Sequence, residues 1–213
     1  MTKDMNESIT TAAPKQARAI ATHQKILNAT VRCLCEIGYA GTSTTVVARR
    51  AGVSQGALYK HFGSKQQLLA ATTEHLFGEL IRDFRGAFAA GAQDEDRVTR
   101  ALMELWRVFL APELYAVVEL YMVSRTDERL RQAMVPVMMR HRANLLDEAR
   151  ALFPEAAAQN PRFETGVEAI MSAMQGAAIS FAVLKDQADG VAFQGFLEHV
   201  WRRELEFPYG ASA

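Results

Sequence analysis

The sequence has no net charge, few prolines and no long apolar run, and each of these absences excludes a class of protein. Its 213 residues carry 24 Lys and Arg against 24 Asp and Glu, and 49% of them are hydrophobic. This composition is that of a folded chain and not of a disordered one. Six prolines and 13 glycines exclude a collagen-like or low-complexity protein. The longest nearly uninterrupted apolar run, 176–184, is shorter than the ~20 residues of a membrane-spanning helix.

Signals for secretion and for metal binding are also missing. Asp4, Asn6 and Glu7 stand where a signal peptide needs an apolar stretch, so we expect a cytoplasmic protein. The two cysteines, Cys33 and Cys35, fall two residues apart in a predicted helix and point to nearly opposite sides. They miss the usual zinc spacing, and we expect two small buried thiols and no metal site.

No sequence feature indicates an enzyme. We find no nucleophile motif, phosphate-binding glycine loop, metal-ligand spacing or carboxylate pair above background. His75, His141 and His199 are far apart in sequence and suggest no shared ligand set. We therefore expect no catalytic activity and no cofactor.

The balanced net charge hides an uneven distribution. Residues 1–65 contain nine Lys or Arg and three acids, which leaves six positive charges there and six negative charges in the rest. A basic end on an acidic body fits a protein that presents that end to a polyanion, although a basic patch can also be a solvated surface.

The hydrophobic pattern is helical along the chain, and no alternating strand pattern is present. Residues 1–17 are polar and aperiodic and are predicted to form a flexible tail. Helices are predicted over about 22–37, 46–51, 55–62, 64–90, 94–111, 112–124, 127–153, 161–185 and 192–206. Pro136 is expected to kink or divide the seventh of these. The sequence predicts an all-α protein of about nine helices.

Residues 42–65, TSTTVVARRAGVSQGALYKHFGSK, read as two short helices joined by a tight turn. Gly52 supplies the backbone angle that such a corner needs. Apolar residues spaced to hold the pair together are Val47, Ala48, Val53, Leu58 and Phe62. The outward positions of the second helix, 55–57 and 59–61, are polar or small, which suits a helix that reads base edges.

Residues within this motif and on both sides of it form a longer pattern. They are Gly38-Tyr39, Ala48, Ala51-Gly52-Val53-Ser54, Gly56-Ala57-Leu58-Tyr59, His61-Phe62, Ser64-Lys65 and Leu68-Leu69. With them, residues 22–70 resemble the TetR family of bacterial transcriptional regulators. The resemblance implies a three-helix DNA-binding domain (18–65), a connecting helix (66–90) and a helical effector-binding and dimerisation domain (91–213).

The resemblance also implies which residues contact DNA. Ser43, Thr44 and Thr45 would meet a phosphate, and one of them a base; Gln55, Gly56, Ala57 and Lys60 would enter the groove; and Tyr59, His61 and Lys65 would contact phosphates. Tyr59 could instead pack inside the small domain, and His61 could be a cap or core histidine. Two departures from the family pattern are Gly63, where proline is common, and Gln55, where lysine is frequent, so base preference does not carry over.

Helix 161–185 is predicted to be apolar on two sides. One side carries large residues, Phe163, Val167, Ile170, Met171, Met174, Ala178 and Phe181, and the nearly opposite side carries small ones, Ala169, Ala173, Gly176, Ala177 and Ser180. A helix apolar on two sides is buried on two sides. We expect the small side, with Phe193, Phe196, Leu197, Val200 and Trp201 of the last helix, to form a four-helix bundle in a homodimer.

Methionines and a tryptophan in the second half indicate an adaptable apolar interior. Together with the resemblance they predict a pocket for a small lipophilic or aromatic effector. Its expected lining is Met103, Trp106, Leu110, Tyr121, Met122, Met138, Met171 and Met174, with Arg125, His141 and Gln175 as polar anchors. Taken singly, such methionines are more often core residues, and Arg125 at a helix end fits a solvated role equally well.

The expected function is that of a ligand-responsive repressor. It would bind a palindromic operator in double-stranded DNA as a homodimer, leave the operator when the effector binds, and act in the bacterial cytoplasm at the nucleoid, away from membranes. The alternative is a DNA-binding architectural or division-control protein of the same fold without a small-molecule effector. A pocket within 95–185 favours the regulator, and a filled core favours the alternative.

Overall fold

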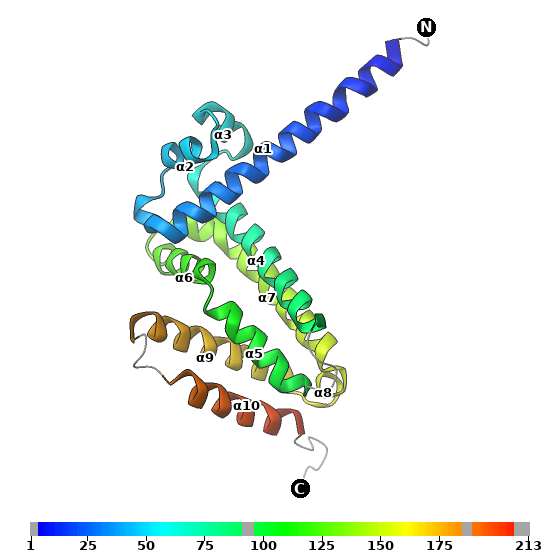
Figure 1. Ribbon diagram of the computed structural model, residues 1–213, viewed down its shortest axis with the longest axis vertical. Helices are drawn as coiled ribbons and strands as arrows, with labels where there is room; N and C mark the ends of the chain where they lie inside the picture. The colour runs from blue at the N-terminus through cyan, green and yellow to red at the C-terminus, as the bar shows by residue number, and fades with distance from the viewer. Residues whose placement is uncertain (1–3, 91–95, 185–188, 207–213) are drawn as a thin grey trace. The chain divides into compact units, whose positions relative to one another are not determined.

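The computed structural model describes residues 4–90, 96–184 and 189–206, with side chains described between 16 and 205, and every regular element in these ranges is a helix (Figure 1). The helices are α1 (Asp4–Gly41), α2 (Thr44–Ala51), α3 (Gln55–His61), α4 (Lys65–Ala90), α5 (Arg97–Phe109), α6 (Pro112–Ser124), α7 (Glu128–Leu152), α8 (Pro154–Gln159), α9 (Phe163–Leu184) and α10 (Gly190–Glu206). The predicted all-α class is confirmed.

The chain divides into two compact units. The first contains Met1–Leu76 and Ala116–Val137, and the second contains Phe77–Tyr115 and Met138–Ala213. Helices α4, α6 and α7 therefore each contribute residues to both units.

Most predicted helix ends are confirmed because caps are local signals. Ser54 caps α3, Ser64 accepts the N–H of Gln67 at 3.1 Å at the start of α4, and Asp127 accepts the N–H of Leu130 at 2.9 Å. Two expectations were wrong. Helix α1 begins at Asp4 and not near residue 22, because the alanines, Lys, Gln and Arg of 12–21 favour helix without an apolar period. Helix α8 was missed, since six residues show no period. Of the two effects expected at Pro136, a kink or a division, the division is excluded, because α7 runs undivided from Glu128 to Leu152.

The first unit is built on a small core shared by α1, α2, α3 and α4. Its buried members are Ile26, Leu27, Ala29, Cys33, Val47, Ala48, Leu58, Phe62 and Leu68, with Val53 packed against them. The apolar residues predicted to hold the two short helices together therefore do so. Cys33 is buried, but Cys35 is exposed, so the expectation of two buried thiols was wrong for Cys35. Residues two apart on a helix point to nearly opposite sides, which turns Cys35 outward.

Gly38 interrupts α1 in a conformation that is essentially restricted to glycine, with φ 66° and ψ −179°. The next residue, Tyr39, donates its N–H to Glu119 Oε2 of α6 at 2.9 Å. A Cβ atom added at Gly38 would lie 3.2 Å from Glu119 Oε1, closer than almost all real Cβ contacts. Thr42 Oγ1 donates to the Gly38 carbonyl at 2.6 Å. A carboxylate of α6 thus fixes the turn that leads into α2.

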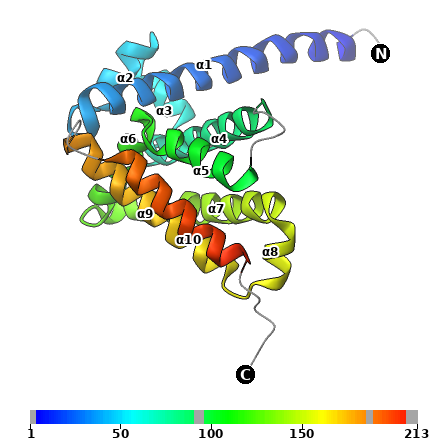
Figure 2. The same ribbon diagram turned by 60° about the horizontal axis from the view of Figure 1, so that its bottom comes forward.

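The core of the second unit gathers the large-residue side of α9 with α5 and α10. Its buried members are Val98, Leu102, Trp106, Phe109, Leu146, Phe163, Val167, Ile170, Met174, Ala178, Leu197 and Trp201. Helices α9 and α10 lie side by side (Figures 1 and 2). Gly166 leaves room for Trp201, whose ring would lie 2.9 Å from a Cβ atom added there.

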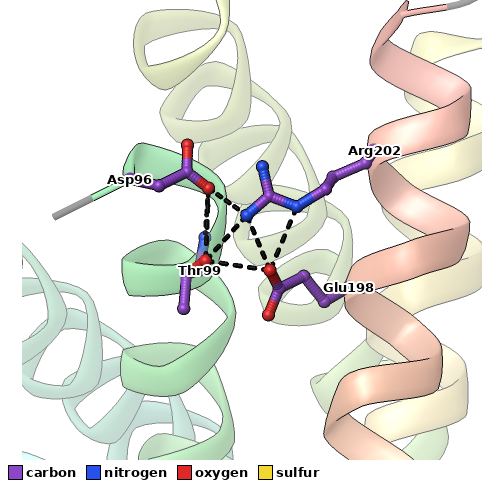
Figure 3. Close-up of polar contacts among 4 residues, drawn as sticks. All are labelled: Asp96, Thr99, Glu198 and Arg202. Carbon is purple, nitrogen blue, oxygen red and sulfur yellow. Dashed lines mark hydrogen bonds and ion pairs between the residues drawn. The ribbon is translucent and has the colours of Figure 1, made fainter.

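A polar cluster joins α10 to the start of α5 (Figure 3). Arg202 donates to the carboxylates of Asp96 and Glu198, and Thr99 Oγ1 donates to Glu198 Oε1 at 3.0 Å. The hydrogen bonds from Arg202 hold the pKa values of both carboxyls below their usual range. Because these side chains are largely solvated, the cluster fixes geometry more than it adds stability.

The backbone at Gly38 gives a direct test of the turn. Gly38→Ala should lower the free energy of unfolding by ~1–3 kcal/mol, since alanine is strained at this φ and ψ and its Cβ meets Glu119. The matched control is Gly86→Ala in α4, where nothing lies within 4 Å of an added Cβ. That variant should be more stable by ~0.5–1 kcal/mol. Urea unfolding followed by circular dichroism measures both, and equal shifts in the two variants would contradict the role of Gly38.

Candidate nucleic-acid interface

Helices α2 and α3 each begin at a serine whose side chain caps the helix. Ser43 Oγ accepts the N–H of Val46 at 3.2 Å, and Ser54 Oγ accepts the N–H of Ala57 at 3.1 Å. Gly52 ends α2 in the left-handed region at φ 68°, and its N–H bonds to the carbonyl of Arg49 at 3.2 Å. Two caps and one glycine therefore set the corner between the helices.

The predicted DNA contacts all come from α2, α3, the residue before α2 and the start of α4. Exposed members are Ser43, Thr45, Gln55, Gly56, Tyr59 and Lys60, and partly buried members are Thr44, Ala57, His61 and Lys65. Tyr59 is 47% exposed and lies outside the buried core cluster. His61 is partly buried, with its ring centroid 6.4 Å from that of Phe62.

Two side-chain bridges tie α2 to α3 on this surface. The Tyr59 hydroxyl lies 3.1 Å from Thr44 Oγ1, and Gln55 Nε2 donates to Thr45 Oγ1. All four residues were predicted from sequence as DNA contacts. The bridges hold these groups in place in the free protein and lower the entropy lost when they meet a ligand.

Lys65 is held by two groups that the sequence did not identify as site residues. Its ammonium lies 4.2 Å from the ring centroid of Tyr39. Burial lowers the pKa of Lys65, and the Asp127 carboxylate opposes this shift. Burial raises the pKa of the Tyr39 phenol, and its hydrogen bond with Asp127 raises that pKa further. Asp127 was predicted only as a helix cap, because its contact with Tyr39 spans 88 residues of chain.

His23 of α1 is a second residue that sequence reasoning missed. Its ring stacks on Phe62 at 4.7 Å and lies edge-on to His61 at 6.0 Å between centroids. Burial lowers the pKa of His23, and the nearby His61 and His75 lower it further. Only the three-dimensional fold brings these histidines together, so no sequence spacing signals them.

Comparison with known proteins identifies the family. Residues 26–72 match the family model "Bacterial regulatory proteins, tetR family". An HTH-type transcriptional regulator of Mycobacterium tuberculosis is 31% identical over 173 residues, which cover 81% of this chain and 89% of that protein. The chain belongs to the TetR family. It is a DNA-binding transcriptional regulator with an N-terminal helix-turn-helix domain.

Two solved structures share the TetR-family fold. A transcriptional regulator from Rhodococcus sp. has a TM-score of 0.66 at 22% identity, covering 87% of this chain and 98% of that one. The multidrug binding protein EbrR, in complex with imidazole, has a TM-score of 0.61 at 20% identity, covering 87% and 96%. At these identities the likeness shows the fold alone.

In this TetR-family chain the residues predicted for the dimer fall into two groups. Ala169, Gly176, Ser180 and Phe196 are exposed, and Ala173, Ala177, Phe193 and Val200 are partly buried. Leu197 and Trp201, each 4% exposed, belong instead to the core of their own subunit. Helix α9 was predicted to carry large apolar residues on one side and small residues on the other. In the structure the side with large residues is buried, and much of the side with small residues is exposed.

The residues predicted for the effector pocket lie in both compact units. Tyr121, Met122 and Arg125 belong to the first, and Met103, Trp106, Leu110, Met138, His141, Met171, Met174 and Gln175 to the second. Trp106 and Met174 are buried, whereas Met103, Leu110 and Met122 are 41–54% exposed. An open pocket of about 350 Å³ lined by Arg97, Phe153 and Asn160 contains none of the predicted residues.

His141 is the most perturbed of these groups. Its ring stacks on Phe77 with 3.5 Å between centroids, and burial lowers its pKa to about 4. Its Nδ1 atom is buried and has no hydrogen-bond partner among the residues that the structure describes. His141 is therefore a neutral imidazole at neutral pH with an unused hydrogen-bonding atom.

Proposed function

We propose that this protein is a ligand-responsive repressor that binds a palindromic operator as a homodimer and leaves it when a small lipophilic or aromatic effector binds. It acts in the bacterial cytoplasm, at the nucleoid when bound to DNA, and catalyses no reaction. The observation that carries the proposal is the capped α2–α3 pair, whose outer side chains and Lys65 form one polar surface.

The proposed division of labour on this surface follows from side-chain chemistry. Gln55 can make a bidentate contact with adenine, and the small Gly56 and Ala57 let the start of α3 approach the bases. Tyr59 and Lys65 carry groups suited to phosphates. The hydrogen bond between Gln55 and Thr45 breaks when Gln55 turns to a base. On DNA that lacks the preferred base, Gln55 keeps its hydrogen bond to Thr45.

The division predicts two kinds of variant. Lys65→Ala and Tyr59→Phe should weaken binding to all sequences alike, and Lys65→Ala should flatten the salt dependence by about one phosphate contact per subunit. Gln55→Ala should relax discrimination at one or two base pairs, each worth ~1–3 kcal/mol. Selection from random double-stranded DNA at several salt concentrations measures both effects. Indistinguishable sequence preferences for Gln55→Ala and Lys65→Ala would contradict the proposal.

The homodimer is supported by the apolar residues that a single chain leaves in solvent. Val183, two turns after Gly176 on α9, is 80% exposed, and Val191 and Phe196 on α10 are 83% and 64% exposed. By length and composition alone, helix α9 is long and apolar enough to cross a membrane. Only 22% of its apolar 18-residue stretch is buried in the single chain. Its large-residue side already packs in the subunit core, so we assign the opposite side to a second copy of the chain.

Gly176→Trp should therefore produce a monomer that no longer binds the operator. Gly176 is exposed, and nothing lies within 4 Å of an added Cβ, so the subunit itself should fold normally. Gly86→Trp is the matched control, because Gly86 is an equally open glycine on α4. Light scattering at micromolar concentration should give dimers for wild type and control only. A monomeric wild type would contradict the proposed dimer.

The effector proposal draws on the residues around Trp106 and on one relative. EbrR, which has the same fold, is described as a multidrug binding protein. In this chain Trp106 meets Phe181 edge to face at 5.4 Å, beside Met174 in the same core. The neutral His141 offers a hydrogen bond and no charge, which suits an uncharged polar group on an apolar molecule. A filled core around Trp106 would instead favour the architectural alternative.

A screen of apolar aromatic compounds for loss of operator binding tests this part. Trp106→Leu and His141→Phe should reduce effector sensitivity by about tenfold, the equivalent of ~1.4 kcal/mol, and leave effector-free operator affinity unchanged. His199→Phe, an exposed histidine on α10, is the control. Sensitivity should stay constant from pH 6 to 8, because His141 titrates near 4. If every effector acts equally on the variants and wild type, the assignment of these residues is wrong.

A further inference from the structure

Helix α1 extends far upstream of the helix-turn-helix domain. The family match begins at Ile26, which is also the first buried core residue of α1, whereas the helix begins at Asp4. Every residue from 16 to 21 is exposed. This part of α1 projects beyond α2 and α3 (Figures 1 and 2). It therefore adds nothing to the core of the domain that carries the DNA-binding residues.

The projecting segment leaves the domain beside the predicted phosphate contacts of α3. His23 stacks on Phe62 and lies 6.0 Å from His61, the last residue of α3. Lys60 directly precedes His61. Arg18 is five residues before His23, or about 7.5 Å of helix, which is the length of roughly two nucleotides of one strand. The segment thus starts at the DNA-facing surface and continues past it.

The charged residues in this part of the chain are all positive. Between residues 8 and 35 the chain contains Lys15, Arg18, Lys25 and Arg32 and no Asp or Glu. Arg18 and Lys25 are exposed and seven residues apart, so two turns of helix place them on one face. Neither forms an ion pair with the residues that the structure describes. Both cations are available to a polyanion.

We propose that residues 16–25 of α1 form a second DNA-contact surface, which binds the phosphate backbone beside the groove entered by α3. Arg18 and Lys25 each neutralise a phosphate and release counterions, so the contact adds affinity without sequence preference. The inference rests on the proposed function, since it needs the α2–α3 pair to be on DNA. It adds to that pair a contact carried by a part of the chain upstream of the family match.

The test compares the double variant Arg18→Ala/Lys25→Ala with wild type in operator binding at 50–200 mM salt. The variant should lower the salt slope by about two for each subunit, or about four for the homodimer on its operator, so that wild type loses roughly a hundredfold more affinity than the variant over this range. The base preference should not change. Arg82→Ala/Arg129→Ala, which removes two exposed positive charges from α4 and α7, is the charge-matched control and should keep the wild-type slope. Arg18→Lys/Lys25→Arg should also keep it.

An unchanged slope in the double variant, or an equal loss in the control, overturns the inference. A wild type that binds no DNA overturns the proposed function with it. If wild type binds and Gln55→Ala alters base preference while Arg18→Ala/Lys25→Ala behaves like wild type, the proposed function stands and only the second surface is lost. Thermal unfolding of each variant verifies that these exposed positions leave the fold intact.

Discussion

The hydrogen bond from the Tyr39 N–H to Glu119 is the contact on which the proposed DNA-binding surface depends. It joins α6 to the turn at Gly38, where the backbone conformation excludes other residues, and that turn sets where α2 begins. The same turn places the Tyr39 ring against Lys65 and its hydroxyl beside Asp127. Two carboxylates, Glu119 within α6 and Asp127 just after it, therefore hold the start of α2 and the start of α4 in one arrangement.

This arrangement gives the proposed repressor a physical route for its response. Effector binding acts on DNA only if it favours one of two arrangements of the protein, typically by ~1–3 kcal/mol. Tyr121 follows Glu119 by two residues, and burial raises the pKa of its phenol to about 12, so it stays protonated. In the proposed mechanism, a change at Tyr121 or Met122 moves Glu119, and with it the turn that positions α2. This hydrogen bond is partly buried, so a shift of Glu119 that breaks it leaves the Tyr39 N–H short of its partner.

What the sequence predicted well was local. Ser54, Ser64 and Asp127 act within three residues of themselves, and the break at Gly38 needs only the glycine, so each could be read from the chain. The large side of α9 was also predictable, because its period requires burial. Glu119, His23 and the Tyr39–Asp127 pair could not be found this way. Their partners lie 38 to 88 residues away, and nothing in a single sequence specifies which distant carboxylate meets which turn.

The composition of α3 supports the proposal that two half-sites and backbone contacts act together. With Gly56 and Ala57 at its start, the helix can approach the bases closely in the proposed complex, but it offers few hydrogen-bonding side chains, chiefly Gln55 and Lys60. Two such contacts at about 1–3 kcal/mol each give one half-site ~2–6 kcal/mol of discrimination, whereas specific regulators need ~4–10. An operator with two half-sites doubles this discrimination free energy, which then reaches that range. In the proposed complex, affinity then comes from groups that ignore sequence, namely Tyr59, Lys65 and residues 16–25 of α1. In this proposal dimerisation provides selectivity, and the charged surface provides binding strength.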